Sequence, residues 1–218
     1  YLSGSISPDI GFLSNLKELW IAENQLSGKL PVQIGQLNNL MYLNISKNKF
    51  QGTIPESIGN LKKLKYLNGW NNNFSGFLPL TIGDLENLEF LSFGSNSLIG
   101  EIPIELGNAK KLESIGLFEN NLIGSIPREL SELPNLKYLG LFDNELDGFI
   151  PESLFIKGFL TYLKLDKNNF SELNHELICR SGFNWDNSVF FDVSNNHIPK
   201  EKNRCHHGLI FHEIYNSY

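Results

Sequence analysis

The residues best suited to covalent or metal chemistry gather near the C-terminus. Cys179 and Cys205 are the two cysteines of the chain, and the five histidines are His175, His197, His206, His207 and His212. A chain end that lacks packing neighbours on one side is stabilised by a cross-link, so we expect a disulfide between the cysteines. Two reduced thiols in an intracellular protein are the alternative. A metal site built from Cys205, His207 and His212 is disfavoured, because their spacing is loose and lacks a CxxC pair.

Nothing else in the chain has the spacing of a catalytic set. No Ser/His/Asp or Cys/His arrangement is suggested, and the glycines recur at a fixed period rather than in a phosphate-binding loop. Acidic residues on neighbouring repeats, such as Glu119 and Asp143, are expected to be solvated. The sequence therefore predicts a protein that is not an enzyme and needs no cofactor.

Asparagine carries the clearest periodic signal. It recurs every 24 residues at Asn24, Asn48, Asn72, Asn96, Asn120, Asn144 and Asn168, with a further copy at Asn196. Glycine follows four places after six of these residues, and proline three places after each glycine. A primary amide offers both donors and acceptors, so we expect these side chains to be buried and to bond backbone groups of their own and the neighbouring repeat.

Each repeat predicts a short strand, a turn at the asparagine, an extended Gly/Pro segment and a short helical or irregular return. Leu43 and Ile45 are two residues apart and so share one face of a strand. One 24-residue unit cannot bury that face, but stacked units can bury a continuous apolar column. Proline fixes φ and should keep its segment extended.

Residues 37–61, LNNLMYLNISKNKFQGTIPESIGNL, follow the pattern LxxLxxLxLxxNxLxGxIPxxLGxL almost letter for letter. The chain thus resembles the plant-type subclass of the leucine-rich repeat family. The resemblance implies an α/β solenoid: a right-handed curved superhelix with a concave parallel β-sheet and short 3-10 or irregular convex segments. It also implies a second set of short strands around the Gly-x-Ile-Pro segment.

The repeat pattern divides the chain into two predicted parts. Residues 1–172 are expected to be leucine-rich repeats of 24 residues, the first truncated and without an N-terminal cap. Residues 173–218 are expected to form an irregular last repeat and a C-terminal cap, because Glu172 and His175 replace the periodic glycine and proline. Inside the repeats, Gly69 stands where Phe93 stands one repeat later, which predicts a small/large pair in adjacent core layers.

Strand residues that point away from the core should line the concave face. The candidate ligand-binding residues there are Trp20, Tyr42, Tyr66, Trp70, Phe118 and Phe142. Exposed aromatic clusters often mark binding surfaces, and Gly94, Gly116 and Gly140 beside the rings predict a groove. The alternative is that the rings merely shield the sheet.

The family resemblance implies a non-enzymatic recognition module that binds a protein or peptide through the concave face. Its setting would be the ectodomain of a receptor-like protein or a secreted defence or inhibitor protein, outside the cell or at its surface. Peptide receptors of the family often carry paired arginines on a strand, and no arginine lies on the predicted strands here. A scaffold subunit of a larger, intracellular assembly is the alternative, and the oxidation state of the cysteines would distinguish them.

Charge and hydropathy argue against two further classes of protein, nucleic-acid binders and membrane-spanning proteins. The net charge of −6 argues against a nucleic-acid partner, and no apolar run is long enough for a membrane helix. Three glycosylation sequons occur, at Asn44, Asn73 and Asn169. Their number is about what the asparagine, serine and threonine content gives by chance, so they are acceptor sites only if the protein is secreted.

Overall fold

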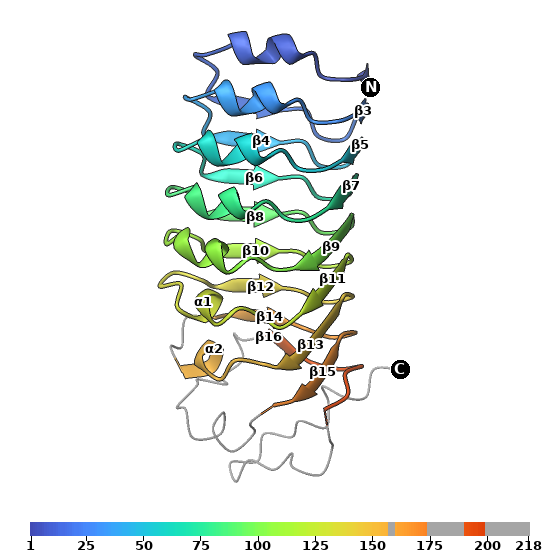
Figure 1. Ribbon diagram of the computed structural model, residues 1–218, viewed down its shortest axis with the longest axis vertical. Helices are drawn as coiled ribbons and strands as arrows, with labels where there is room; N and C mark the ends of the chain where they lie inside the picture. Colours follow the sequence, from blue (N-terminus) through green and yellow to red (C-terminus); the bar gives the residue numbers. More distant parts are fainter. Residues whose placement is uncertain (157–159, 174–189, 199–218) are drawn as a thin grey trace.

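The computed structural model describes residues 1–156, 160–173 and 190–198. Successive coils of the chain stack along one long axis and form a solenoid (Figure 1). A complete coil contributes one strand to each of two parallel sheets and a short helix between them. The α/β solenoid expected from the repeat pattern is confirmed.

The first sheet, which we call the concave sheet, has eight parallel strands in the order β16-β14-β12-β10-β8-β6-β4-β2. Pairing joins residues 24 positions apart, as in Leu43 with Leu67, except that Tyr162 pairs with Phe190. The middle residue of each strand faces the core, so the first and third residues face outward. The strands are β2 (Glu18–Trp20), β4 (Tyr42–Asn44), β6 (Tyr66–Asn68), β8 (Phe90–Ser92), β10 (Ser114–Gly116), β12 (Tyr138–Gly140), β14 (Tyr162–Lys164) and β16 (Phe190–Asp192).

The second sheet follows the asparagine turn of each coil. Its strands are β1 (Ser3–Gly4), β3 (Gln25–Gly28), β5 (Lys49–Gly52), β7 (Asn73–Gly76), β9 (Ser97–Glu101), β11 (Asn121–Gly124), β13 (Glu145–Phe149) and β15 (Asn169–Glu172). The periodic glycine adopts a left-handed backbone at this point, with φ of 76° at Gly52. A side chain there would be strained, which explains why glycine recurs.

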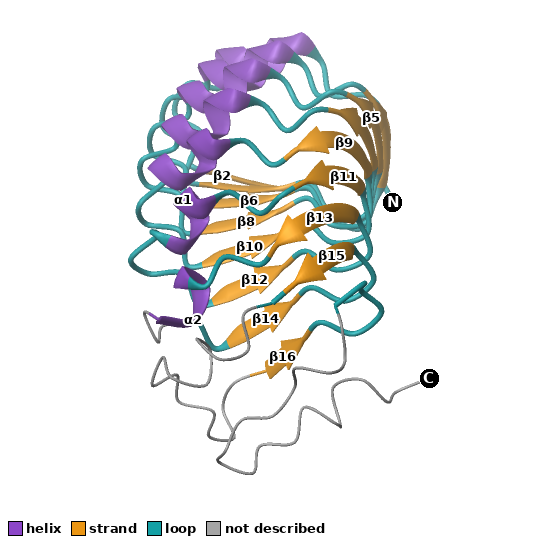
Figure 2. Ribbon diagram, turned by 60° about the horizontal axis from the view of Figure 1, so that its bottom comes forward, coloured by secondary structure: helices purple, strands orange, loops and turns teal. Residues whose placement is uncertain are grey.

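Short helices return each coil to the concave sheet. They are the 3-10 helices η1 (Pro8–Phe12), η2 (Val32–Gln36), η3 (Glu56–Asn60), η4 (Leu80–Asp84) and η5 (Ile104–Asn108), followed by α1 (Arg128–Ser131) and α2 (Ser153–Ile156). The helices lie together along one side of the stack (Figure 2). Pro31 is extended at φ −68° and ψ 142° and leads into η2, which buries Ile34. None of the helices in the described ranges has the length and apolar character that crossing a membrane requires.

The periodic asparagines tie each coil to the one before it. Asn120 Nδ2 lies 3.0 Å from the Phe93 carbonyl of the preceding coil and 3.1 Å from the carbonyls of Leu117 and Phe118. Its Oδ1 accepts the N–H of Leu98 at 2.9 Å. The same four bonds recur at Asn48, Asn72, Asn96, Asn144, Asn168 and Asn196. Asn24 makes the corresponding bonds within its own coil and accepts the N–H of Leu2.

The residue before each asparagine has a positive φ that the sequence did not reveal. These residues are Glu23, Lys47, Asn71, Ser95, Glu119, Asp143, Lys167 and Asn195, with φ between 50° and 56°. Residues with a Cβ rarely adopt this conformation. The inter-coil hydrogen bonds on both sides, such as Glu119 N–H to the Phe142 carbonyl at 2.9 Å, hold it in place.

The core is one column of apolar side chains that runs through all coils. The Phe50 ring stacks on Phe74 at 6.1 Å, and Phe74 meets Phe93 edge-on at 5.6 Å. Phe93 is buried, and a Cβ added to Gly69 would overlap its ring. The small and large residues of adjacent layers are therefore complementary.

Candidate ligand-binding surface on the concave sheet

Outward-facing residues of the concave sheet form three columns along the stack. The first column contains Glu18, Tyr42, Tyr66, Phe90, Ser114, Tyr138, Tyr162 and Phe190, and the second contains Trp20, Asn44, Asn68, Ser92, Gly116, Gly140, Lys164 and Asp192. The third column, two residues beyond each strand, contains Ala22, Ser46, Trp70, Gly94, Phe118, Phe142, Asp166 and Ser194. Strand alternation presents all three columns on one face.

Aromatic rings stack along the first column and across to the second. Tyr66 stacks on Phe90 at 4.5 Å between ring centroids, while Trp20 lies 6.1 Å from Tyr42 and 5.6 Å from Tyr66. Trp20 is 53% exposed, and its Nε1 donates to Glu18 at 2.9 Å. We call Trp20, Tyr42, Tyr66 and Phe90 the N-terminal aromatic stack.

A second stack continues the first column after the break at Ser114. Tyr162 lies between Tyr138 at 4.3 Å and Phe190 at 4.7 Å. Burial raises the pKa of the Tyr138 phenol to about 12, with smaller contributions from the charge of Tyr162 and a hydrogen bond with it. The Tyr138 hydroxyl thus stays protonated well beyond neutral pH.

Phe118 and Phe142 of the third column form a parallel pair, with centroids 4.6 Å apart and planes inclined by 4°. A Cβ on Gly94 would lie 2.7 Å from the Phe118 ring, and one on Gly116 would lie 3.3 Å from it. The groove that we expected beside these glycines is therefore filled by the Phe118 ring. The glycines let the ring lie close to the backbone, and the face of Phe142 that does not pack on Phe118 is covered by the Lys164 ammonium at 3.8 Å.

Trp70 is half-buried and held by polar contacts on both sides. Its Nε1 donates to Ser95 Oγ at 3.0 Å, and Ser95 Oγ in turn donates to the carboxylate of Glu119. The Lys47 ammonium lies 5.3 Å from the centre of the Trp70 ring. These contacts fix the orientation of the indole, which favours a preformed binding surface.

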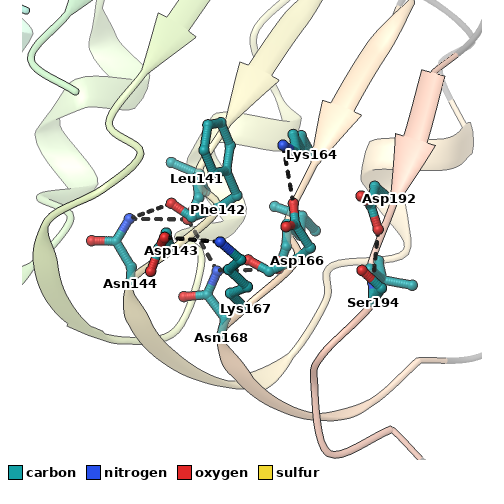
Figure 3. Close-up of polar contacts among 12 residues, drawn as sticks. Leu141, Phe142, Asp143, Asn144, Lys164, Asp166, Lys167, Asn168, Asp192 and Ser194 are labelled. Carbon is teal, nitrogen blue, oxygen red and sulfur yellow. Dashed lines mark hydrogen bonds and ion pairs between the residues drawn. The ribbon is translucent and has the colours of Figure 1, made fainter. Parts of the chain in front are cut away.

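Charged side chains concentrate at the C-terminal end of the second and third columns, where Lys164, Asp166 and Asp192 lie (Figure 3). Asp166 is only 5% exposed, and its Oδ1 accepts no hydrogen bond. Lys164 Nζ lies 3.7 Å from that oxygen. Burial raises the pKa of Asp166, and the charge of Asp192 raises it further. The charge of Lys164, a backbone hydrogen bond to the carboxylate and the charge of Lys167 partly offset both effects.

Ion pairs line the edge of this face at the positive-φ positions. Lys167 Nζ lies 3.2 Å from Asp143, and Lys47 Nζ lies 2.7 Å from Glu23. Pairing with Asp143 raises the pKa of Lys167, and pairing with Lys47 lowers the pKa of Glu23. Because both pairs are largely exposed, we assign them little stabilising free energy.

The remaining predicted residues fall in three places. Asn44 faces the concave side, where its Oδ1 accepts from both the N–H and the hydroxyl of Ser46. Asn73 and Asn169 are exposed on the second sheet. Cys179 and Cys205 lie outside the described residues, as do His175, His206, His207 and His212. Within the described ranges, no three His, Cys, Asp or Glu residues are grouped to hold a metal ion.

Lys164, Asp166 and Asp192 were not predicted to form a site. The repeat register could have predicted that they lie close together, because the three residues occupy adjacent positions of the second and third columns. The register does not predict that the Asp166 carboxylate is buried, because burial depends on the conformations of the neighbouring side chains.

Comparison with known proteins agrees with this architecture. The Leucine Rich Repeat family model matches residues 15–37, 39–61, 87–109 and 135–155. No curated protein sequence matches the chain at a significant level.

Solved structures of plant receptor ectodomains are similar over most of the chain. The Arabidopsis receptor kinase HAESA, in complex with the peptide hormone IDA and the co-receptor SERK1, is 37% identical with a TM-score of 0.82, over 90% of this chain and 32% of that one. The GASSHO1/SCHENGEN3 ectodomain from Arabidopsis thaliana, in complex with CASPARIAN STRIP INTEGRITY FACTOR 2, is 37% identical with a TM-score of 0.81, over 89% and 23% of the two chains.

The ectodomain of the Arabidopsis receptor kinase SOBIR1 is 30% identical with a TM-score of 0.55, and the match covers 58% of this chain and 69% of that one. The chain spans about a third of the length of the larger ectodomains that it matches. With its asparagine-tied coils, its two parallel sheets and these similarities, the chain belongs to the leucine-rich repeat family, in its plant-type subclass.

Proposed function

We propose that the chain is a non-enzymatic recognition module that binds a peptide or protein through its concave face. The observation that carries this proposal is the set of partly exposed aromatic stacks on the concave sheet. Together with Trp70, these stacks include the candidate residues Trp20, Tyr42, Tyr66, Phe118 and Phe142. Rigid aromatic anchors of this kind dominate the binding energy of many interfaces.

The similar structures support a peptide ligand and an extracellular setting. HAESA is seen with a peptide hormone, and GASSHO1/SCHENGEN3 with CASPARIAN STRIP INTEGRITY FACTOR 2. We therefore propose that the chain is part of the ectodomain of a receptor-like protein, or of a secreted defence or inhibitor protein. The one arginine of the described residues, Arg128, lies in α1 and away from the concave strands, so a ligand carboxylate would need another partner.

We further propose that residues 1–172 form the repeat array and residues 173–218 an irregular last repeat with a C-terminal cap closed by a Cys179–Cys205 disulfide. Mass spectrometry of the non-reduced protein tests the disulfide directly. Two free thiols would contradict it and would favour the alternative of an intracellular scaffold subunit.

A peptide selection tests the binding role. Random peptides displayed on phage would be selected on the purified chain, and enriched peptides would be measured by fluorescence anisotropy. The concave variant Trp70→Ala/Phe118→Ala/Phe142→Ala should lose at least about tenfold in affinity, because it removes three anchors. Far-ultraviolet circular dichroism should show that its fold persists.

The matched control removes three exposed apolar side chains from the second sheet: Ile99→Ala/Ile123→Ala/Phe149→Ala. These residues are 44%, 44% and 65% exposed. The control should bind the selected peptides like the wild type. Equal affinity of the concave variant, or a loss confined to the control, would show that the concave face is not the binding surface.

A further inference from the structure

The carboxylate of Asp166 is buried with one of its two oxygens unsatisfied. Its Oδ1 accepts no hydrogen bond, and the nearest cation, Lys164 Nζ, lies 3.7 Å away. That distance exceeds a hydrogen bond. Buried polar atoms are normally satisfied, so an unsatisfied carboxylate oxygen on a candidate binding face points to a donor that is supplied by a ligand.

The ring of Phe142 lies next to the same Lys164 ammonium that faces Asp166. Lys164 Nζ lies 3.8 Å from the centre of the Phe142 ring, within the range of a cation–π contact. The other face of Phe142 packs on Phe118, which holds the ring in position. A cation is therefore accommodated between an aromatic face and a carboxylate, and in the free chain that cation is Lys164.

Negative charge exceeds positive charge around this position. Asp192 lies close enough to raise the pKa of Asp166, and its Oδ1 accepts the N–H of Ser194 at 2.9 Å. Lys167 is engaged by Asp143 at 3.2 Å. Among the described residues, Lys164 is thus the cation left to balance the carboxylates of Asp166 and Asp192, and a second positive charge would be favourable here.

We propose that Phe142, Asp166 and Asp192 form a subsite for a cationic side chain of the ligand, with the Lys164 side chain moving aside to admit it. A guanidinium suits the subsite best, because it is planar, stacks on aromatic rings and donates several hydrogen bonds to carboxylates. This inference rests on the proposed function, since it assigns a ligand chemistry to one part of the concave face. A metal ion is not favoured, because no described group offers three suitable ligands.

An NMR titration of the whole chain tests the subsite with a defined probe. The probe is n-butylguanidinium, and n-butylurea is its neutral counterpart of the same shape. We expect n-butylguanidinium to shift the backbone amide signals of Phe142 and Asp166 with saturable behaviour. The urea should leave these signals unchanged, because it lacks the charge that the carboxylates attract.

Three variants separate charge recognition from structural effects. Asp166→Asn and Asp192→Asn should each weaken n-butylguanidinium binding at least about fivefold, whereas Lys164→Met should strengthen it by a similar factor because it removes the internal competitor. Asp147→Asn, which changes an exposed carboxylate on strand β13 of the second sheet, is the matched control and should leave the affinity unchanged. Equal shifts with n-butylurea, no shift with either probe, or undiminished binding by Asp166→Asn would overturn the subsite.

The peptide selection distinguishes failure of this inference from failure of the proposed function. Peptides that bind through the concave face but carry no basic residue, and that bind Asp166→Asn as tightly as wild type, would refute the cationic subsite alone. Failure of the concave variant to lose peptide affinity would instead refute the proposed function.

Discussion

The ring of Phe93 occupies the volume into which a side chain on Gly69 would project. Gly69→Leu should therefore overpack the core and lower the free energy of unfolding by about 1–3 kcal/mol. Ile45→Leu, a volume-conserving change at the equivalent position one coil earlier, should cost less. Thermal unfolding of both variants checks the prediction, and a Gly69→Leu midpoint at or above wild type would contradict it. Adding Phe93→Leu should restore part of the loss, since the two residues share one space.

Asn120 satisfies three carbonyls and one N–H, all of them in or near the core. Asn120→Leu would leave buried backbone groups without partners, and we expect a loss of about 3 kcal/mol or more in the free energy of unfolding. Asn24→Leu is the control, because Asn24 is only partly buried and bonds to no carbonyl of a preceding coil, its one inter-coil bond being the N–H of Leu2. Denaturant titrations should show a clearly smaller loss at Asn24, and equal losses would argue against inter-coil bonding as the cause.

How far the sequence could predict this molecule differs between its parts. The phase of Asn48 and the spacing of Leu43 and Ile45 were enough for the coils, the parallel sheets and the asparagine bonds, because those depend on backbone geometry that repeats. The positive φ of Glu119 carries no residue signature, since unrelated side chains share that position. The aromatic columns were visible in the sequence, but the packing of Phe118 over Gly94 depends on rotamers chosen between neighbouring coils.

Asp166→Asn should stabilise the protein at neutral pH. The pKa of Asp166 is raised above its ordinary value of 3.8, mainly by burial, so the folded state holds this proton more tightly than the unfolded state. The carboxylate contribution to the free energy of unfolding therefore becomes less favourable as the pH rises from 3.8 through the raised pKa. The stability difference between variant and wild type should be largest at neutral pH and vanish below 3.8.

Thermal unfolding across that pH range measures the effect, with Asp147→Asn as the control. A lower midpoint for Asp166→Asn at neutral pH would show that the ionised carboxylate contributes to the fold. A gain in stability together with weaker guanidinium binding would instead identify Asp166 as a residue retained for recognition at the expense of stability.

Tyr138→Phe should remove an alkaline component of unfolding. Because the phenol of Tyr138 has its pKa raised from 10.0 to about 12, the folded state retains a proton that the unfolded state loses. Stability therefore falls as the pH rises from 10 toward 12, and the phenylalanine variant should fall less steeply. Denaturation midpoints between these pH values check this expectation, and parallel curves for the two proteins would contradict it.

The asparagine bonds make the stack directional. The Asn48 side chain accepts the N–H of Leu26 and donates to the carbonyl of Ile21, both in the coil before its own. Asn196 likewise accepts the N–H of Phe170 and donates to the carbonyl of Leu165. Within the described ranges, no later asparagine makes the corresponding hydrogen bonds to the coil that contains Asn196. The two ends of the described stack thus differ: both leave edge strands with unpaired backbone N–H and C=O groups, and the trailing coil in addition requires an amide from another segment to bond its asparagine turn.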